Sequence, residues 1–165
     1  MNVPLLDLKT QYQGIKDEVL AAVKEIFESQ QFILGPRVEQ LEKEIAEYCG
    51  SRFAVGVSSG SDALLISLMA AGIGPGHRVL TTPYTFFATA GAIARSGATP
   101  VFVDIEADTC NLSPTGARQV MEAMDEAERS SVKAPIPAHL YSQPAETAPP
   151  RGSARRCEMT VSEGA

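Results

Sequence analysis

Residues 53–105 read FAVGVSSGSDALLISLMAAGIGPGHRVLTTPYTFFATAGAIARSGATPVFVDI. The alternation of short apolar runs and longer segments in this stretch indicates the fold class. Short apolar runs bounded by polar or turn residues predict three strands, the first of them buried, at 53–57, 78–82 and 99–105. Longer segments that end at a glycine predict two helices, at 62–71 and 86–96. Strand, helix, strand, helix, strand with short connections indicates an α/β domain with a mainly parallel sheet and flanking helices.

Two amphipathic helices are expected ahead of this stretch. In the first, at 12–27, apolar residues recur every three or four positions and share one face. The second begins at Pro36, which suits a first helical turn, and ends at Gly50. Both apolar faces are expected to pack on something else.

Beyond residue 105, Ser113 and Pro114 predict a helix that runs to about Glu128. The segment 132–139 is expected to form at most an edge strand, because Pro135 and Pro137 supply no N–H to a ladder.

The composition excludes several classes of protein. Among 165 residues, 44% are hydrophobic and the formal net charge is −6, which favours one globular domain and argues against nucleic acid as a partner. We find no apolar run long enough for a membrane helix and no signal-peptide pattern at the start, so the expected location is cytoplasmic. The cysteines are widely spaced and predict neither a zinc site nor a disulfide framework.

The first candidate for a binding site is the turn Ser58-Ser59-Gly60-Ser61-Asp62. A strand that stops here and opens a helix leaves N–H groups free for a phosphate, at the positive end of the helix dipole. Gly60 permits close approach, and Ser59 or Ser61 adds a hydroxyl. The alternative is that these residues are ordinary helix caps.

A second candidate lies at the end of the next predicted strand, where ligands of open α/β sheets gather. An aromatic residue at Phe86 or Phe87 can stack on a flat cofactor ring. Alternatively, both rings plug the following helix into the core.

In order and spacing, several motifs together resemble the DegT/DnrJ/StrS family of sugar-nucleotide aminotransferases. They are VPLLDL (3–8), FILGP (32–36), VGVSSGSDAL (55–64), TTPYTFFATAGAIARSGATPVFVDI (81–105) and HLYSQPA (139–145). The resemblance implies the aspartate-aminotransferase-like (type I) fold of pyridoxal-phosphate transferases, here its large domain in truncated form.

The resemblance also implies a cofactor, substrates and an assembly. Members of this family are homodimers that use pyridoxal 5'-phosphate to move an amino group from glutamate to a nucleotide-linked keto sugar. Gly60 and Ser61 match the positions that hold the cofactor phosphate, and Phe86 matches the aromatic residue that stacks on the pyridine ring. Family members usually carry threonine at the position of Ser61, and either residue supplies the hydroxyl. Where this chain has Ser142, a glycine is usual.

Such an enzyme further needs a Schiff-base lysine and an aspartate that keeps the pyridine nitrogen protonated. In the family both follow HLYGQPA, whereas this chain leaves the pattern at about Glu146. We therefore expect residues 1–145 to be the front part of the large domain and residues 146–165 to be a disordered, non-family tail. An out-of-frame reading of a GC-rich gene would explain such a tail.

None of the lysines matches the catalytic position; they are Lys9, Lys16, Lys24, Lys43 and Lys133. The expected outcome is a family member with no catalytic residue of its own, inactive alone. The alternative is a non-catalytic protein that binds a phosphorylated ligand, or a regulatory protein that pairs with a full-length relative.

Overall fold

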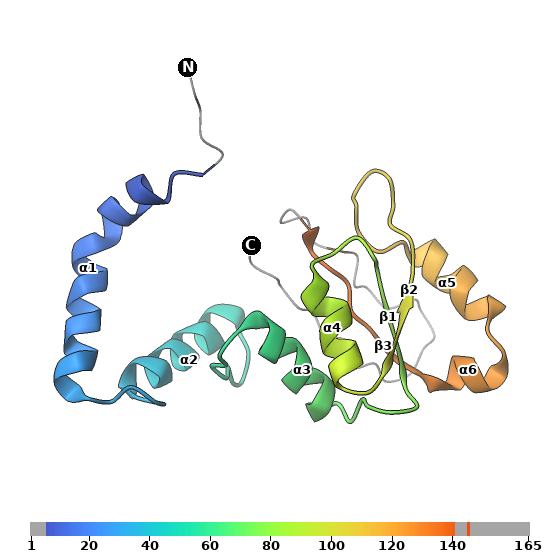
Figure 1. Cartoon of the computed structure of the whole chain (residues 1–165), viewed down its shortest axis with the longest axis horizontal. Helices are drawn as coiled ribbons and strands as arrows, with labels where there is room; N and C mark the ends of the chain where they lie inside the picture. Colours follow the sequence, from blue (N-terminus) through green and yellow to red (C-terminus); the bar gives the residue numbers. More distant parts are fainter. Residues whose placement is uncertain (1–5, 141–144, 146–165) are drawn as a thin grey trace, which may run out of the picture. The chain divides into compact units, whose positions relative to one another are not determined.

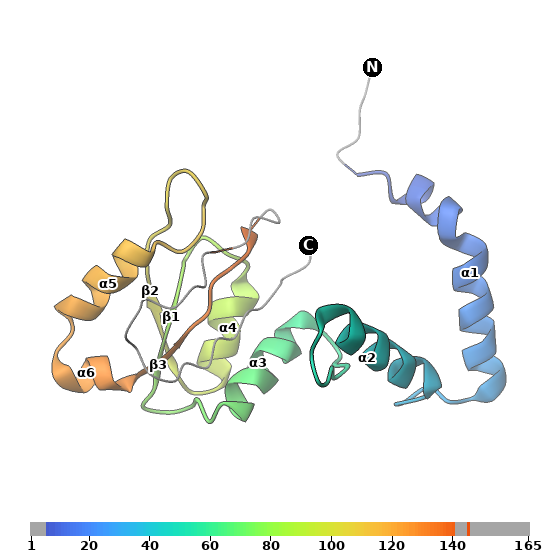
Figure 2. The same cartoon turned by 180° about the vertical axis from the view of Figure 1, so that it is seen from behind.

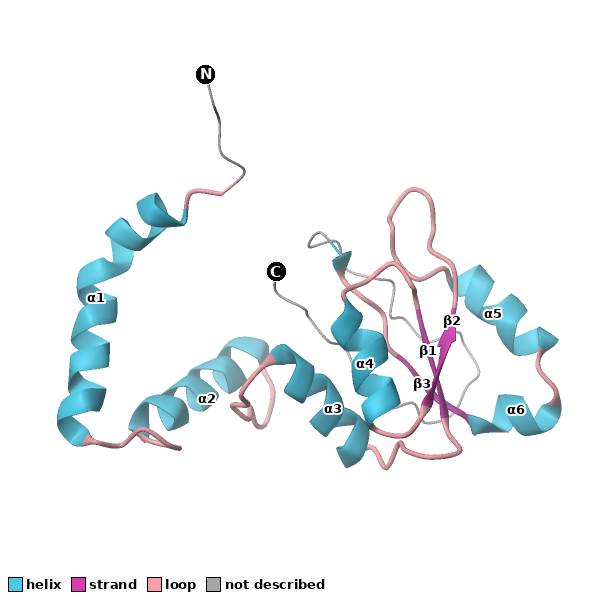
Figure 3. Cartoon of the chain, viewed as in Figure 1, coloured by secondary structure: helices cyan, strands magenta, loops and turns pink. Residues whose placement is uncertain are grey.

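The computed structural model describes residues 6–140 and Ala145, which fall into two compact units, Met1–Gly56 and Val57–Ala165. In chain order the elements are α1 (Leu8–Ser29), α2 (Pro36–Cys49), α3 (Gly60–Ala70), β1 (Arg78–Thr81), α4 (Phe87–Arg95), β2 (Thr99–Phe102), α5 (Pro114–Ala123), α6 (Glu126–Ser131) and β3 (Val132–Pro135) (Figures 1 and 3). No helix in the described ranges has both the length and the apolar character needed to cross a membrane.

The first unit consists of α1 and α2, and both confirm predicted helices. Asp7 caps α1: its carboxylate accepts the Thr10 N–H at 3.1 Å and the Thr10 hydroxyl at 2.7 Å. The hydroxyl bond, followed by the backbone bond, holds the pKa of Asp7 below its ordinary value. Pro36 takes the first turn of α2, and Gly50 ends it in the left-handed conformation with φ 62°.

The apolar faces of these helices remain uncovered. Tyr12, Ile15, Val19 and Val23, which share one face of α1, are 39–47% exposed. On α2, Leu41, Ile45 and Tyr48 are exposed as well. Neither helix contains a buried residue. The predicted stripes are therefore present, and no described residue buries them.

The second unit is built on a parallel sheet in the order β2-β1-β3. Arg78 of β1 is opposite Thr99 of β2 and Val132 of β3. Between Arg78 and Val79 the register with β3 shifts by one residue, so this pairing carries a bulge. Among the described strands β3 lies at an edge, as its prolines predict.

Helices flank this sheet. Figures 1 and 2 show α4 on one side of the strands and α5 on the other, and α3 packs against α4. The core lies between α3, α4 and the sheet, and it is formed by Leu64, Leu68, Ile73, Val79, Ala92, Ile93, Ala98, Ala134 and Ile136. This arrangement confirms the α/β class with a parallel sheet and flanking helices.

The buried strand expected at 53–57 is absent, so that prediction was wrong. Phe53 is 72% exposed and Val55 76% exposed. A strand needs a neighbour to satisfy its N–H and C=O groups, and no described segment pairs with this one. Side chains take over that role: the Gly56 N–H donates to Glu42 Oε1 at 2.7 Å.

The helix expected from Ser113 to about Glu128 is in fact two helices. Ser113 caps α5 as predicted, and its Oγ accepts the Gly116 N–H at 3.2 Å. At Met124 the backbone becomes extended, with ψ 147°, and Asp125 then caps α6. The Asp125 carboxylate accepts the Glu128 N–H at 2.7 Å, and this new cap stabilises the break.

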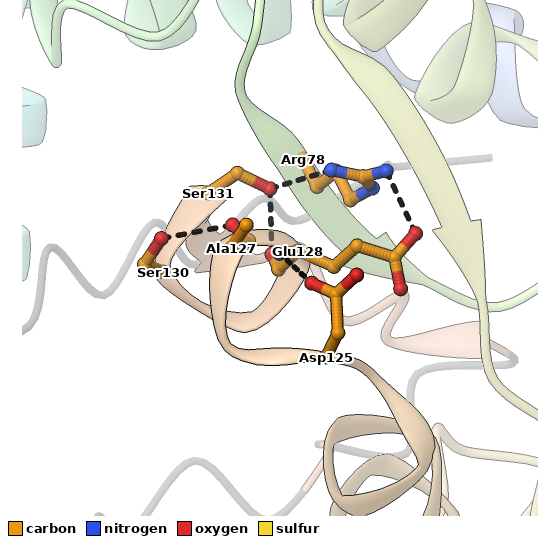
Figure 4. A network of polar contacts seen from close by, with 6 residues as sticks. All are labelled: Arg78, Asp125, Ala127, Glu128, Ser130 and Ser131. Carbon is orange, nitrogen blue, oxygen red and sulfur yellow. Dashed lines mark hydrogen bonds and ion pairs between the residues drawn. The ribbon is translucent and has the colours of Figure 1, made fainter.

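A polar network ties α6 to the sheet (Figure 4). The guanidinium of Arg78, the first residue of β1, donates to Ser131 Oγ at 2.8 Å and to Glu128 Oε1 at 3.0 Å. Ser131 Oγ donates in turn to the Glu128 carbonyl at 2.6 Å. Because α6 leads directly into β3, these contacts fix the entry of β3 beside β1.

Candidate functional site

The first turn of α3 contains two N–H groups without an acceptor among the described residues. Ser59 is the N-cap: its Oγ accepts the Asp62 N–H at 3.1 Å, and its carbonyl accepts the Ala63 N–H at 2.9 Å. Within the described part of the chain, no acceptor bonds to the N–H of Gly60 or Ser61. The cap interpretation is confirmed, and it leaves the anion site possible as a prediction, since the cap uses the N–H groups of Asp62 and Ala63.

Gly60 leaves the space beside this turn open. A Cβ built at Gly60 would meet no atom within 4 Å, and the residue is exposed. Protein packing therefore does not require a glycine here. Ser61, the next residue, is half-buried with its hydroxyl at the same turn. Unpaired N–H groups at a helix start are the donors that phosphate sites use, so a phosphate at this turn stays a prediction.

Two side chains brace the turn in a way that sequence reasoning missed. The Ser58 hydroxyl donates to Asp62 Oδ2, so the turn is closed from its other side. Arg95, in the last turn of α4, lies with its Nη1 4.0 Å from Asp62 Oδ1. Asp62 is recognisable locally as a residue of a helix start, whereas a partner 33 positions along the chain, from 62 to 95, leaves no local signal.

Threonines hold the segment that follows β1. Thr82 Oγ1 accepts the Tyr84 N–H at 3.2 Å, and the Thr85 and Thr89 hydroxyls are bonded at 3.1 Å. Thr82 and Thr89 are buried, which anchors both ends of the segment. Phe86, between these anchors, is the N-cap of α4 and provides no side-chain cap.

The Phe86 ring faces solvent. It is 68% exposed, and Phe87 is 82% exposed, so neither ring plugs α4 into the core of the described structure. The alternative reading, in which both rings fill the core, is therefore wrong. An apolar residue is a poor N-cap, so its position is not explained by helix stability. Stacking of Phe86 on a flat ring stays a prediction.

The candidate residues belong to the starts of two helices, α3 and α4, that pack against each other. No hydrogen bond, ion pair or ring contact joins Phe86 to Gly60 or Ser61 among the described residues. Their assembly into one site is a proposal that the packing of α3 on α4 supports.

The lysines do not approach these residues through any observed contact. All five are exposed. Lys24 Nζ is 3.7 Å from Glu28 Oε1 on α1, and Lys133 Nζ donates to the Ser130 carbonyl at 2.9 Å. Over 6–140 and Ala145, no three His, Cys, Asp or Glu residues are grouped to hold a metal ion.

An open pocket of about 500 Å³ lies elsewhere, in the first unit, where residues 30–36 and Glu39 line it. It shares no residue with the predicted site, and its lining offers a single carboxylate, from Glu39. We assign no role to it.

The fold and the candidate site define an α/β domain with a capped, open helix start at α3 and an exposed aromatic ring at the start of the neighbouring helix α4. The chain matches the model of the DegT/DnrJ/EryC1/StrS aminotransferase family over residues 13–165, and it belongs to that family. The match includes residues 146–165, which lie outside the described residues. The domain boundary at residue 145 therefore stays a prediction.

Relatives of known name agree with this assignment. The chain is 47% identical over 165 residues to a pleiotropic regulatory protein of Geobacillus stearothermophilus, covering 100% of this chain and 42% of that protein. It is 41% identical over 141 residues to the UDP-2-acetamido-2-deoxy-3-oxo-D-glucuronate aminotransferase of Pseudomonas aeruginosa, covering 86% and 37%. The chain thus spans about two fifths of the length of these relatives.

A solved structure shows the same fold. The crystal structure of NtdA from Bacillus subtilis, with bound cofactor PMP, superposes with a TM-score of 0.79 at 31% identity. The superposition covers 88% of this chain and 32% of that one. The type I aminotransferase fold implied by the sequence motifs is therefore confirmed, in the part that this chain covers.

Proposed function

We propose that this protein belongs to a system for pyridoxal-phosphate-dependent amino transfer from glutamate to a nucleotide-linked keto sugar. The role of this chain in that system is to bind the phosphate end of the cofactor. The observation that carries this proposal is the first turn of α3, where no described acceptor bonds to the N–H groups of Gly60 and Ser61 and the space beside Gly60 is open. Membership of the family and the PMP bound to a structural relative support the choice of ligand.

Each candidate residue has a defined task in this proposal. Gly60 and Ser61 donate backbone N–H groups to phosphate oxygens, and the Ser61 hydroxyl adds a third donor. Phe86 covers one face of the pyridine ring. When bound, the cofactor supplies an electron sink for carbon–nitrogen chemistry.

We further propose that these 165 residues bind the cofactor without turning substrate over. A proton must move between carbon atoms of the substrate and cofactor, and in this class a lysine amine moves it. The five lysines here are solvated, and none is joined to the candidate residues by an observed contact. Among the described residues, no lysine is therefore positioned to act as that base.

A second candidate function is non-catalytic: a regulatory protein that binds a phosphorylated ligand or pairs with a full-length relative. The specific observation in its favour is the 47% identity to a protein named as a pleiotropic regulator. Association of two family chains has a structural basis in the uncovered apolar face of α1, defined by Tyr12, Ile15, Val19 and Val23. We propose that this face forms part of a homodimer.

Calorimetric titration of the purified chain with pyridoxamine 5'-phosphate and with pyridoxamine tests the proposal. Neither ligand has an aldehyde, so neither reacts with surface lysines. The phosphate ester is expected to bind at least about tenfold more tightly, because charge-assisted hydrogen bonds contribute roughly 1.5–3 kcal/mol. Equal affinities would overturn the phosphate assignment.

Two further readouts separate the candidate functions. Inorganic phosphate that competes as strongly as pyridoxamine 5'-phosphate would show that the ring contributes nothing, which favours a general phosphate-binding protein. Turnover of glutamate and a UDP-linked keto sugar by the purified chain, with added cofactor, would contradict our proposal that the chain alone does not catalyse.

A further inference from the structure

Asp62 poses an electrostatic problem for a phosphate at the start of α3. Its carboxylate belongs to the same helical turn as Gly60 and Ser61, and it closes that turn by accepting the Ser58 hydroxyl. A carboxylate suits a helix N-terminus by itself, since it lies at the positive end of the dipole. Beside a phosphate dianion, however, its negative charge repels the ligand.

Arg95 is placed to cancel that charge. It comes from α4, the neighbouring helix, and its Nη1 lies 4.0 Å from Asp62 Oδ1. Among the ion pairs observed in the described residues, this is the one that joins α3 to α4. Because both side chains are partly exposed, the pair adds little to stability, and its contribution falls with salt.

We propose that Arg95 is a positioning residue for phosphate recognition: by pairing with Asp62 it neutralises the carboxylate that braces the binding turn. This inference rests on the proposed phosphate function of Gly60 and Ser61. Asp62 is thus retained for its bond to Ser58 without loss of anion affinity. The pair also joins α3, which carries the phosphate donors, to α4, which begins after Phe86.

A simpler role for Arg95 is stabilisation of its own helix. It occupies the last turn of α4, where a cation is favourable beside the free carbonyl groups. In that role its loss changes the stability of α4 and leaves the contribution of the phosphate group to binding unchanged. The two roles therefore predict different outcomes.

The test is a charge cycle on the full chain with the variants Asp62→Asn, Arg95→Gln and the double variant. The measured quantity is the ratio of the affinity for pyridoxamine 5'-phosphate to that for pyridoxamine, which isolates the phosphate group from the ring. Asparagine keeps an oxygen that can accept the Ser58 hydroxyl, so the turn stays closed. Circular dichroism and thermal unfolding report folding of every variant.

We expect Arg95→Gln to lower the ratio about fivefold at low ionic strength and Asp62→Asn to raise it by a similar factor. The double variant, in which the charges balance again, returns to the wild-type ratio. All differences shrink at high salt. A double variant that stays as weak as Arg95→Gln, or an unchanged ratio in all three variants, would overturn the inference.

Failure of this inference is distinguishable from failure of the proposed function. If the wild-type chain does not prefer the phosphate ester, the phosphate assignment itself is wrong and the charge role of Arg95 falls with it. If the wild-type chain prefers the ester and the cycle shows no charge reversal, only the role of Arg95 is wrong. Arg95→Lys, which keeps the charge, is the conservative control and is expected to keep the wild-type ratio; a ratio as low as that of Arg95→Gln would contradict a role for the charge.

Discussion

Gly60 begins α3 with open space where a side chain would start. A methyl group there meets no protein atom, and alanine restricts the unfolded chain more than glycine does. We therefore expect Gly60→Ala to raise the free energy of unfolding by about 0.4–1 kcal/mol. The same methyl group keeps a phosphate from the N–H donors, so the affinity for pyridoxamine 5'-phosphate is expected to fall about tenfold.

Gly97 provides the matched control. Its φ is +84°, and an added Cβ would lie 2.8 Å from Pro75 Cγ. Gly97→Ala is expected to lower the free energy of unfolding by about 1–3 kcal/mol and to keep the preference for the phosphate ester. Denaturant unfolding and calorimetry measure both quantities. A Gly60→Ala chain that binds the ester like the wild type would show that the phosphate lies elsewhere.

Some residues of the candidate site could be predicted from the sequence and others could not. Local physics indicated an anion-receptive turn at Ser58–Asp62, and the family motifs named Gly60, Ser61 and Phe86. The pairing of Arg95 with Asp62 was not predictable, because it depends on how α3 packs on α4 rather than on any local pattern.

Among the helices and strands, the features that could be predicted from the sequence are those that local residue patterns determine. Gly50 and Gly97 mark helix ends because both adopt positive φ, and the strands β1 and β2 follow from short apolar runs. The strand expected at 53–57 failed because a strand also needs a partner, which periodicity does not report. The break between α5 and α6 did have a signal, since Asp125 followed by Glu128 resembles a capping pattern.

The uncovered face of α1 leads to a prediction about association. We expect the chain to self-associate, because Tyr12, Ile15, Val19 and Val23 place a continuous apolar stripe in water. Val19→Lys puts a charge in the middle of this stripe and is expected to shift the chain toward monomer. Sedimentation velocity at several concentrations measures the shift.

Ala21→Lys is the control for that variant. It adds the same charge to α1, about 180° around the helix from Tyr12, and it is expected to leave self-association unchanged. If both variants dissociate the chain equally, net charge rather than the apolar stripe explains the effect. If neither does, α1 is not the contact surface.

For the whole molecule, both the family assignment and the fold are supported by most of the sequence. The family match covers residues 13–165, and the described structure supplies a parallel sheet and the packing of α3 on α4, the helices at whose starts the candidate residues lie. Within this fold, we propose that the first turn of α3 holds the phosphate of the cofactor.

The amide resonances of the isotopically labelled chain report whether a phosphate binds at this turn. On titration with pyridoxamine 5'-phosphate, we predict that the amide protons of Gly60 and Ser61 move downfield as they donate to phosphate oxygens, while the ring resonances of Phe86 shift by stacking. Pyridoxamine without phosphate is predicted to leave both amides in place. Amides of Gly60 and Ser61 that do not respond, while resonances elsewhere in the chain do, would contradict the account.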